Sequence, residues 1–349
     1  MNSKSNQIRH QNIVHTTLDQ YLPTISPEDL VVVSPTSYHK LNSQCQQLLK
    51  TRCNMVFTTA IQAVGIKTFA KVYQSLTTVY AIGGGIAIDF AKYLAAHFGA
   101  RCVVIPSMLS TNAFATNKVA ILEDGHKHTE NGILPDEVVL DDYYLAQSSR
   151  GNLYGLVDVY SIFIALVDWE LAERNAGVTI DQDIYDRAKN LLIQAIVVGR
   201  NIAFQREGVD PIRDIFEVVQ EAGYITNEYG SGRPESGSEH IFAATLEANR
   251  PIPHALAVTL GMHVMLYYYQ TTQHFSSKWV QAFHCIPFSE LGIIDDINAR
   301  KLSWPLVQTV LKNMVPRSDK YTIVDTLNIG EPPDELRQHL KQFGIVLED

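Results

Sequence analysis

The sequence predicts an α/β N-terminal domain built on a mostly parallel sheet, followed by an all-α C-terminal domain. Between about residues 30 and 141, short β-branched runs alternate with amphipathic stretches long enough for crossover helices. After about residue 150, long helical patterns dominate. A chain of 349 residues also exceeds the size at which one core usually stops growing. We therefore expect domains at residues 1–150 and 151–349.

Six short runs are expected to form strands. A helix is expected over residues 86–99, where Ile86, Phe90 and Leu94 recur at helical spacing. A polar, turn-rich segment joins the fifth and sixth runs and predicts an added hairpin or meander. The expected strands are LVVVS (30–34), NMVFTT (54–59), TVYAIGGG (78–85), CVVIPS (102–107), KVAILE (118–123) and EVVLDD (137–142).

The second half is expected to be helical over residues 154–174, 183–204, 238–249 and 253–270. Its most apolar stretches are interrupted by charged or polar residues such as Asp158 and His263, which favours buried helices over membrane spans. The start of the chain lacks the apolar run of a signal peptide. We therefore expect a cytoplasmic protein with no membrane segment.

Composition excludes several classes of function. The chain carries 28 Lys and Arg against 37 Asp and Glu, a formal charge of −9, which argues against broad binding to nucleic acid or anionic lipid. A local basic pocket for one phosphate stays open. The four cysteines form no CxxC pair and are expected to be reduced core thiols rather than disulfides or zinc ligands.

A run of three glycines is the strongest local signal. Gly83, Gly84 and Gly85 follow an expected strand and precede an expected helix, where free N–H groups and the helix dipole favour a phosphate. The spacing is not GxGxxG, and a simple tight turn remains the alternative. Asp89 and Lys92 lie three apart on the same helix face and could equally form a solvated ion pair.

Three residues of the helical half are candidate metal ligands. Asp158 lies among apolar residues of a helix, where a carboxylate is costly to bury unless it is paired or bound to a metal. His240 and His254 are of the type that zinc and iron sites use. The alternatives are a salt bridge from Asp158 to an arginine and two hydrogen-bonded core histidines. Spacing alone does not select these three from twelve histidines and 37 acids.

The order of the motifs resembles one family. GGGxxxDxxK (83–92), GxxD (155–158), SGSEH (236–240) and a second His before a small, apolar helix (254–261) are similar to the sn-glycerol-1-phosphate dehydrogenases. These belong to the superfamily of iron-containing alcohol dehydrogenases, glycerol dehydrogenases and 3-dehydroquinate synthases. The resemblance implies a dehydroquinate synthase-like fold, with an NAD(P)-binding α/β domain, a helical metal- and substrate-binding domain, and a homo-oligomeric assembly.

The resemblance also implies roles for individual residues. The metal ligands are Asp158, His240 and His254, holding one Zn²⁺, with Fe²⁺ as the alternative. The implied cofactor residues lie in two loops: Gly83, Gly84, Gly85 and Asp89 at the pyrophosphate and nicotinamide side, and Ser107, Ser110, Thr111 and Thr116 at the riboses. The expected strand before residue 35 ends without an acidic residue, which permits NADP as well as NAD.

Some positions depart from the family pattern. Asn112 stands where glycerol-1-phosphate dehydrogenases carry an Asp near the substrate hydroxyls, which puts the native polyol in doubt. Ala244 and Ser161 replace a His and a Lys of the cyclase branch, which argues against a cyclase reaction. Lys118 and Arg233 match cyclase positions that hold the substrate and its phosphate. The alternative is a surface Lys and an Arg paired with a nearby acid such as Glu235 or Glu239.

We therefore expect an NAD(P)- and Zn-dependent oxidoreductase that interconverts a small, phosphorylated ketone and its alcohol, with dihydroxyacetone phosphate as the first candidate. The metal ligands and Asn112 are the expected catalytic residues, and Asn112, Lys118 and Arg233 would seat the substrate. One alternative is a 3-dehydroquinate synthase-like sugar-phosphate cyclase or lyase that uses NAD transiently. Another is a non-catalytic relative that only binds nucleotide.

Overall fold

The computed structural model describes residues 11–59, 69, 72–73, 75–123, 126–272, 277–327 and 332–349. The chain forms two compact units. Unit 1 comprises Met1–Asn152 with Val219–Glu228, and unit 2 comprises Leu153–Val218 with Tyr229–Asp349. The segment Val219–Glu228 therefore packs with unit 1, although the residues before and after it in the sequence belong to unit 2.

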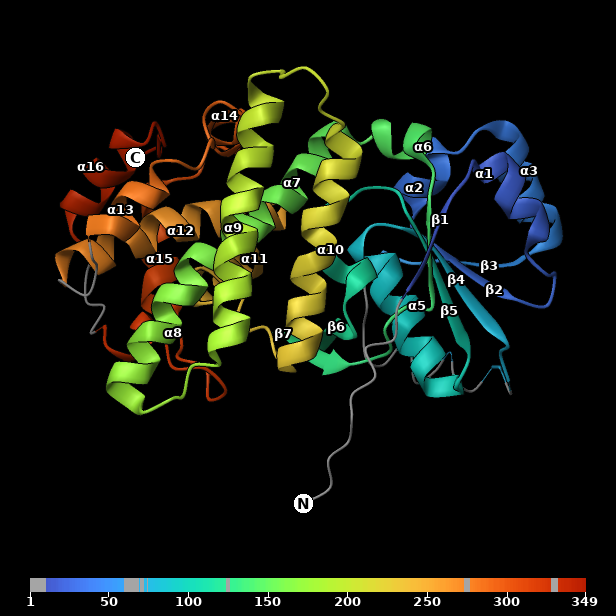
Figure 1. The fold of residues 1–349 in the computed structure, drawn as a ribbon, viewed down its shortest axis with the longest axis horizontal. Helices are drawn as coiled ribbons and strands as arrows, with labels where there is room; N and C mark the ends of the chain where they lie inside the picture. Colours follow the sequence, from blue (N-terminus) through green and yellow to red (C-terminus); the bar gives the residue numbers. More distant parts are fainter. Residues whose placement is uncertain are drawn as a thin grey trace. The chain divides into compact units, whose positions relative to one another are not determined.

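Unit 1 is built on a six-stranded parallel sheet with the order β1-β8-β5-β4-β2-β3 (Figure 1). The central strands are buried on both faces, which is why they carry consecutive apolar residues instead of alternating apolar and polar ones. The strands are β1 (Asn12–His15), β2 (Leu30–Val33), β3 (Asn54–Phe57), β4 (Thr78–Gly83), β5 (Arg101–Pro106) and β8 (Glu137–Leu140). Five of these lie where the sequence predicts them.

Unit 1 also contains a two-stranded hairpin and an edge strand that the sequence does not predict. The predicted hairpin is present, because β6 (Lys118–Glu123) pairs antiparallel with β7 (His126–Asn131). The edge strand β1 is not predicted by the sequence. Its four residues lack a clear hydrophobic pattern, and it forms by pairing in parallel with β8 from Asn12 opposite Glu137.

The helices of unit 1 flank the sheet, and α5 is the one that follows the glycine run. It begins at Gly85, with only Gly84 between it and the end of β4, and ends at Phe98, followed by Gly99, which adopts a left-handed conformation with φ of 64°. The predicted helix over 86–99 is thus confirmed. The helices are α1 (Leu18–Tyr21), η1 (Leu22–Thr24), α2 (Pro35–Lys40), α3 (Ser43–Arg52), α5 (Gly85–Phe98), η2 (Asn112–Ala115) and α6 (Asp142–Ala146).

Unit 2 is helical throughout its named elements (Figure 1). Two of its helices, α7 and α10, have residues in both units. The elements are α7 (Ser149–Tyr160), α8 (Ile162–Ala176), α9 (Gln182–Ala203), α10 (Pro211–Tyr229), α11 (Ser238–Asn249), α12 (His254–Thr271), α13 (Ser277–Phe283), α14 (Ile293–Asn298), α15 (Trp304–Asn313), η3 (Ile323–Asp325) and α16 (Asp334–Gln342).

The sequence pattern predicts one helix over residues 154–174, and this is wrong. The chain forms two helices, α7 and α8, that meet at Ser161. The Ser161 hydroxyl lies 2.5 Å from the carbonyl oxygen of Asp158 and 2.7 Å from that of Glu235. A serine that bonds to backbone carbonyls competes with the helical ladder, and apolar periodicity does not reveal this competition.

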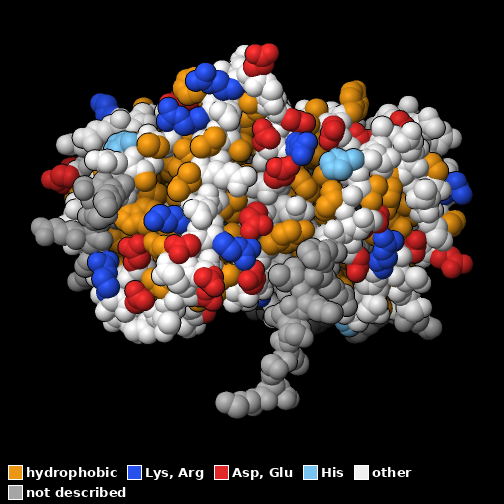
Figure 2. Space-filling view, viewed as in Figure 1, with side chains coloured by type: hydrophobic (Ala, Val, Ile, Leu, Met, Phe, Trp, Pro, Cys, Tyr) orange, Lys and Arg blue, Asp and Glu red, His pale blue; other side chains and the backbone are white. Residues whose placement is uncertain are grey.

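Helices α11 and α12 pack closely because α12 carries a glycine at their contact. A Cβ atom at Gly261 would lie 2.6 Å from the backbone oxygen of Glu239, closer than real Cβ atoms approach. Helix α12 is buried on nearly all sides, and among the described residues no helix is long and apolar enough to cross a membrane. On the face drawn in Figure 2, acidic and basic side chains of the described residues are interspersed.

Candidate metal centre and glycine loop

Three side chains of unit 2 converge on one point. Donor atoms of Asp158, His240 and His254 all lie within 4.8 Å of one another, and each residue is partly buried. Asp158 lies near the end of α7, His240 is the third residue of α11, and His254 is the first residue of α12. The structure thus brings together the three metal ligands that the sequence predicts.

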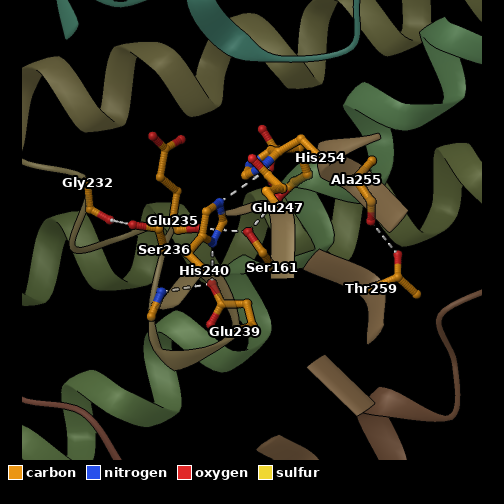
Figure 3. A network of polar contacts seen from close by, with 12 residues as sticks. Ser161, Gly232, Glu235, Ser236, Glu239, His240, Glu247, His254, Ala255 and Thr259 are labelled. Carbon is orange, nitrogen blue, oxygen red and sulfur yellow. Dashed lines mark hydrogen bonds and ion pairs between the residues drawn. The ribbon is translucent and has the colours of Figure 1, made fainter. Parts of the chain in front are cut away.

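Each histidine is oriented by a carboxylate on its far side (Figure 3). Nδ1 of His240 lies 2.6 Å from Oε1 of Glu239, and Nδ1 of His254 lies 2.5 Å from Oε1 of Glu247. Because a carboxylate accepts, Nδ1 carries the proton in the neutral form of each ring, and Nε2 then presents a lone pair. Carboxylates in this position are the usual second partners of metal-binding histidines.

The distances fit a bound ion. Nε2 of His240 lies 3.5 Å, and Nε2 of His254 lies 3.7 Å, from Oδ1 of Asp158. Two ligands of one tetrahedral ion, each at about 2.1 Å, lie about 3.4 Å apart, close to both separations. The donor set of two imidazoles and one carboxylate also suits Zn²⁺ or Fe²⁺.

The charge of the centre is strongly negative. Burial disfavours a charged His240, but hydrogen bonds with Asp158 and Glu239 outweigh it and raise the pKa of His240 to about 9. Together with Glu247, three carboxylates surround two imidazoles. Such surroundings attract a cation and stabilise it once it is bound.

A buried carboxylate holds the start of α11. Oδ2 of Asp168 accepts the N–H of Ser238 at 2.6 Å, and Oδ1 accepts the N–H of Ile323 at 2.8 Å and the hydroxyl of Tyr269 at 2.5 Å. Burial and the charge of Glu239 raise the pKa of Asp168 to about 6, against the opposing effect of these hydrogen bonds. Asp168 thereby fixes the backbone two residues before His240.

A buried lysine holds the loop before α11. Nζ of Lys320 donates to the carbonyl oxygens of Gly232 and Ser236 at 2.9 and 2.8 Å, and it lies 2.5 Å from Oγ of Ser236. The loop that leads to His240 is therefore braced by a residue from the C-terminal part of the chain. Figure 3 shows the bond within this loop, from the Ser236 hydroxyl to the Gly232 oxygen.

Sequence reasoning missed Glu247 and Lys320 and gave Glu239 no role at the metal centre. Glu239 could have been suspected because it precedes a candidate ligand directly. Glu247 and Lys320 carry no local signal, since their partners lie on other elements. Asp168 gave a partial signal as a charge inside an apolar helix pattern.

Arg233 lies in the same loop, in unit 2, and is only 5% exposed. Its Nη1 donates to the backbone oxygen of Tyr321 at 2.8 Å, and burial lowers the pKa of its guanidinium. The structure thus gives this side chain a partner inside the protein. Its role in holding a substrate phosphate stays a prediction.

The glycine run forms the turn between β4 and α5 in unit 1. Gly83 ends β4, Gly84 precedes the helix, and Gly85 is its first residue. A Cβ atom at Gly83 would lie 2.7 Å from Cβ of Ala87, and one at Gly85 would lie 3.2 Å from Oγ1 of Thr111. Space therefore demands a glycine at Gly83, while a side chain at Gly85 would require Thr111 to shift slightly. The turn presents the N-terminus of a 14-residue helix, where anions are stabilised.

The hydroxyl loop (residues 107–118) runs beside this turn, and its side chains differ in exposure. Ser110 and Thr111 are partly exposed. Ser107 is buried, with its hydroxyl 2.8 Å from that of Ser37, and Thr116 is 4% exposed and donates to Asn227 at 3.1 Å. Ser110 and Thr111 are therefore open to a ligand, whereas Ser107 and Thr116 bind within the protein.

The predicted substrate residues of unit 1, Asn112 and Lys118, lie in the middle and at the end of this loop. Asn112 begins η2 and is partly exposed. Lys118 begins β6, and its Nζ donates to Oδ1 of Asn131 at 2.7 Å, while burial lowers its pKa. The contact of both residues with a substrate stays a prediction.

Comparison with known proteins agrees with these features. Residues 11–148 match a family model described as iron-containing alcohol dehydrogenase. The glycerol-1-phosphate dehydrogenase [NAD(P)+] of Methanosarcina acetivorans is 25% identical over 258 residues, 71% of this chain and 68% of that protein. The enzyme of the same name from Caldivirga maquilingensis is 22% identical over 321 residues, 88% and 86% of the two chains.

Solved structures share the fold. An iron-containing alcohol dehydrogenase superposes with a TM-score of 0.66 at 16% identity, covering 96% of this chain and 98% of the other. A probable glycerol dehydrogenase from Sinorhizobium meliloti gives 0.62 at 16% identity, covering 95% and 96%. The predicted dehydroquinate synthase-like fold is thus confirmed. Residues 11–148 thus resemble the iron-containing alcohol dehydrogenases, and over most of its length the chain is similar to glycerol-1-phosphate dehydrogenases.

Proposed function

We propose that this protein is a metal-dependent NAD(P)H oxidoreductase that interconverts a small phosphorylated ketone and its alcohol. Dihydroxyacetone phosphate is the first candidate for the ketone. The observation that carries the proposal is the pair of imidazoles, His240 and His254, with both Nε2 atoms turned to Asp158 and both Nδ1 atoms on carboxylates. The names of the relatives support the reaction type.

Asp158, His240 and His254 would hold the ion, with Zn²⁺ as first choice and Fe²⁺ as alternative. When bound, the ion supplies Lewis-acid polarisation of a substrate carbonyl. Glu239 and Glu247 keep the imidazoles in the ligating tautomer. This arrangement needs no rearrangement of the side chains upon binding, which favours affinity.

The dinucleotide, NAD or NADP, would bind in unit 1. The N-terminus of α5 and the glycine turn suit its pyrophosphate, and the hydroxyls of Ser110 and Thr111 suit its riboses. Asn112, Lys118 and Arg233 remain our candidates for the substrate hydroxyls and phosphate. We expect the active protein to be a homo-oligomer, by analogy with the superfamily.

The experiment is to measure bound metal and NADH or NADPH oxidation with dihydroxyacetone phosphate, for the wild type and Asp158→Ala. We expect about one Zn²⁺ per chain and stoichiometric oxidation in the wild type, and loss of both in the variant. Asp183→Ala, which removes an exposed carboxylate of α9, is the matched control. Full activity in a metal-free Asp158→Ala protein would contradict the proposal. Turnover without net oxidation would point to the cyclase or lyase alternative.

A further inference from the structure

Lys92 of α5 is a fully buried lysine whose ammonium bonds to one short segment of the chain. The sequence left a solvated Asp89–Lys92 pair open, and that alternative is wrong, since the Lys92 side chain has no exposed surface. Its Nζ donates to the carbonyl oxygens of Ala113 at 2.8 Å, Thr116 at 3.0 Å and Lys118 at 2.5 Å. An ammonium has three protons, so these carbonyls use its full donor capacity.

Asp89 completes this connection. Its Oδ1 lies 2.8 Å from Nζ of Lys92, which compensates the buried charge, and its Oδ2 accepts the N–H of Ala120 at 3.1 Å. Helix α5, which begins at the glycine turn, is therefore bonded to η2 and to the first residues of strand β6. Releasing these partners would leave the buried ammonium of Lys92 unpaired, which costs a large amount of free energy, and Lys92 therefore holds them firmly.

The same segment is held from a second side by Asn227 of α10. Nδ2 of Asn227 donates to the carbonyl oxygen of Ala115 at 2.9 Å, and its Oδ1 accepts the N–H of Asn117 at 2.9 Å. The backbone of the same helix approaches closely, because a Cβ atom at Gly223 would lie 2.6 Å from the Ala115 oxygen. Residues 113–118 are thus bonded to α5 and α10.

These contacts hold the later part of the hydroxyl loop, and the side chains of residues 110–112 before it are partly exposed. Ser110, Thr111 and Asn112 directly precede the clamped segment and are partly exposed, and Thr111 lies against Gly85 of the glycine turn. We propose that Lys92 is a positioning residue for dinucleotide binding, whose ammonium holds the hydroxyl loop against the glycine turn before the dinucleotide arrives. The inference rests on the proposed function. Preorganisation of this kind raises affinity by reducing the ordering cost of binding.

The test compares wild type, Lys92→Met and Lys92→Arg with a matched control, Lys320→Met. Lys320 is also a buried lysine that donates to loop carbonyls, but in unit 2. Because it braces the loop before His240, Lys320→Met is a control for the dinucleotide Kd alone and not for zinc content or kcat. The dissociation constants of NADH and NADPH are measured from nucleotide fluorescence, alongside zinc content and KM and kcat. We expect Lys92→Met to raise the Kd and the KM for the dinucleotide at least tenfold, with zinc content kept and kcat at saturating dinucleotide within about threefold.

A dinucleotide Kd that partly recovers in Lys92→Arg, and one that is unchanged in Lys320→Met, would support a positioning role for Lys92. Both results would argue against general destabilisation of the fold as the cause of the weaker binding. Wild-type Kd in folded Lys92→Met overturns the inference, as does an equal rise in Lys320→Met. If Lys92→Met does not fold, Asn227→Ala decides: it should raise the Kd at least threefold with zinc retained, and an unchanged Kd overturns the inference. A wild type that binds neither dinucleotide overturns the proposed function itself, which distinguishes the two failures.

Discussion

Replacing Glu247 tests whether His254 is a metal ligand without touching any proposed ligand. Oε1 of Glu247 lies 2.5 Å from Nδ1 of His254, on the far side of the ring from Asp158. Glutamine at this position keeps a neutral oxygen that can still accept the Nδ1 proton. Alanine removes the acceptor, and the ring then loses both its tautomer preference and its orientation.

The expected loss of zinc affinity follows from the role of carboxylates that accept a hydrogen bond from a metal-binding histidine. Their loss costs metal sites about 10- to 100-fold in affinity, or about 1.4 to 2.7 kcal/mol. Because the glutamine retains an acceptor, we place Glu247→Gln near the lower figure and Glu247→Ala near the upper one. The removal of a negative charge near the ion acts in the same direction in both variants.

The assay is competition for Zn²⁺ with a chelator at neutral pH, read as the apparent dissociation constant of the metal. The control is Glu170→Gln, which changes another partly buried glutamate of unit 2, one that accepts a hydrogen bond from Tyr185. We expect the control to bind zinc as the wild type does. If Glu247→Ala also binds zinc with wild-type affinity, His254 is not oriented by Glu247 and the ligand assignment is refuted.

Three other outcomes are expected. Burial lowers the pKa of His263 to about 4, so between pH 6.5 and 4 the unfolded chain binds more protons and stability falls as the pH falls. Urea unfolding at pH 7 and 5 should show a loss of about 2 kcal/mol that His263→Gln removes, and identical losses would contradict it. Gly261→Ala should destabilise by about 1 to 3 kcal/mol in the same assay, although alanine favours helix, because its methyl group meets the Glu239 backbone; a more stable variant would refute the close approach. Thr111→Val should raise the Kd of NADH by about fivefold with zinc content unchanged, and unaltered binding would exclude its hydroxyl as a contact.

Much of the fold could be predicted because its signals are local. Buried parallel strands are apolar runs, and the helix after the glycine run has a periodic apolar face. The edge strand β1 could not be predicted, because its partner β8 lies more than a hundred residues away. The break at Ser161 was missed because it depends on a carbonyl, that of Glu235, supplied by a distant loop.

Less of the candidate site than of the fold could be predicted from the sequence. Asp158, His240 and His254 could be named only through the resemblance, since three helices bring them together and no spacing records that proximity. The role of Lys92 could not be predicted from the sequence either. Its pairing with Asp89 at i and i+3 suits a surface helix, and only the fold shows that the hydroxyl loop covers it.

Both histidines of the metal centre lie in the first turn of a helix, His240 in α11 and His254 in α12. A helix N-terminus carries about half a positive elementary charge, which by itself opposes a cation. The carboxylates of Asp158, Glu239 and Glu247 bring three negative charges, more than ligation alone requires. The N-termini of the two helices together offset about one of these charges. With both imidazoles neutral, as ligation requires, the candidate centre then carries roughly two negative charges, which is the charge that a divalent ion neutralises and a monovalent ion does not.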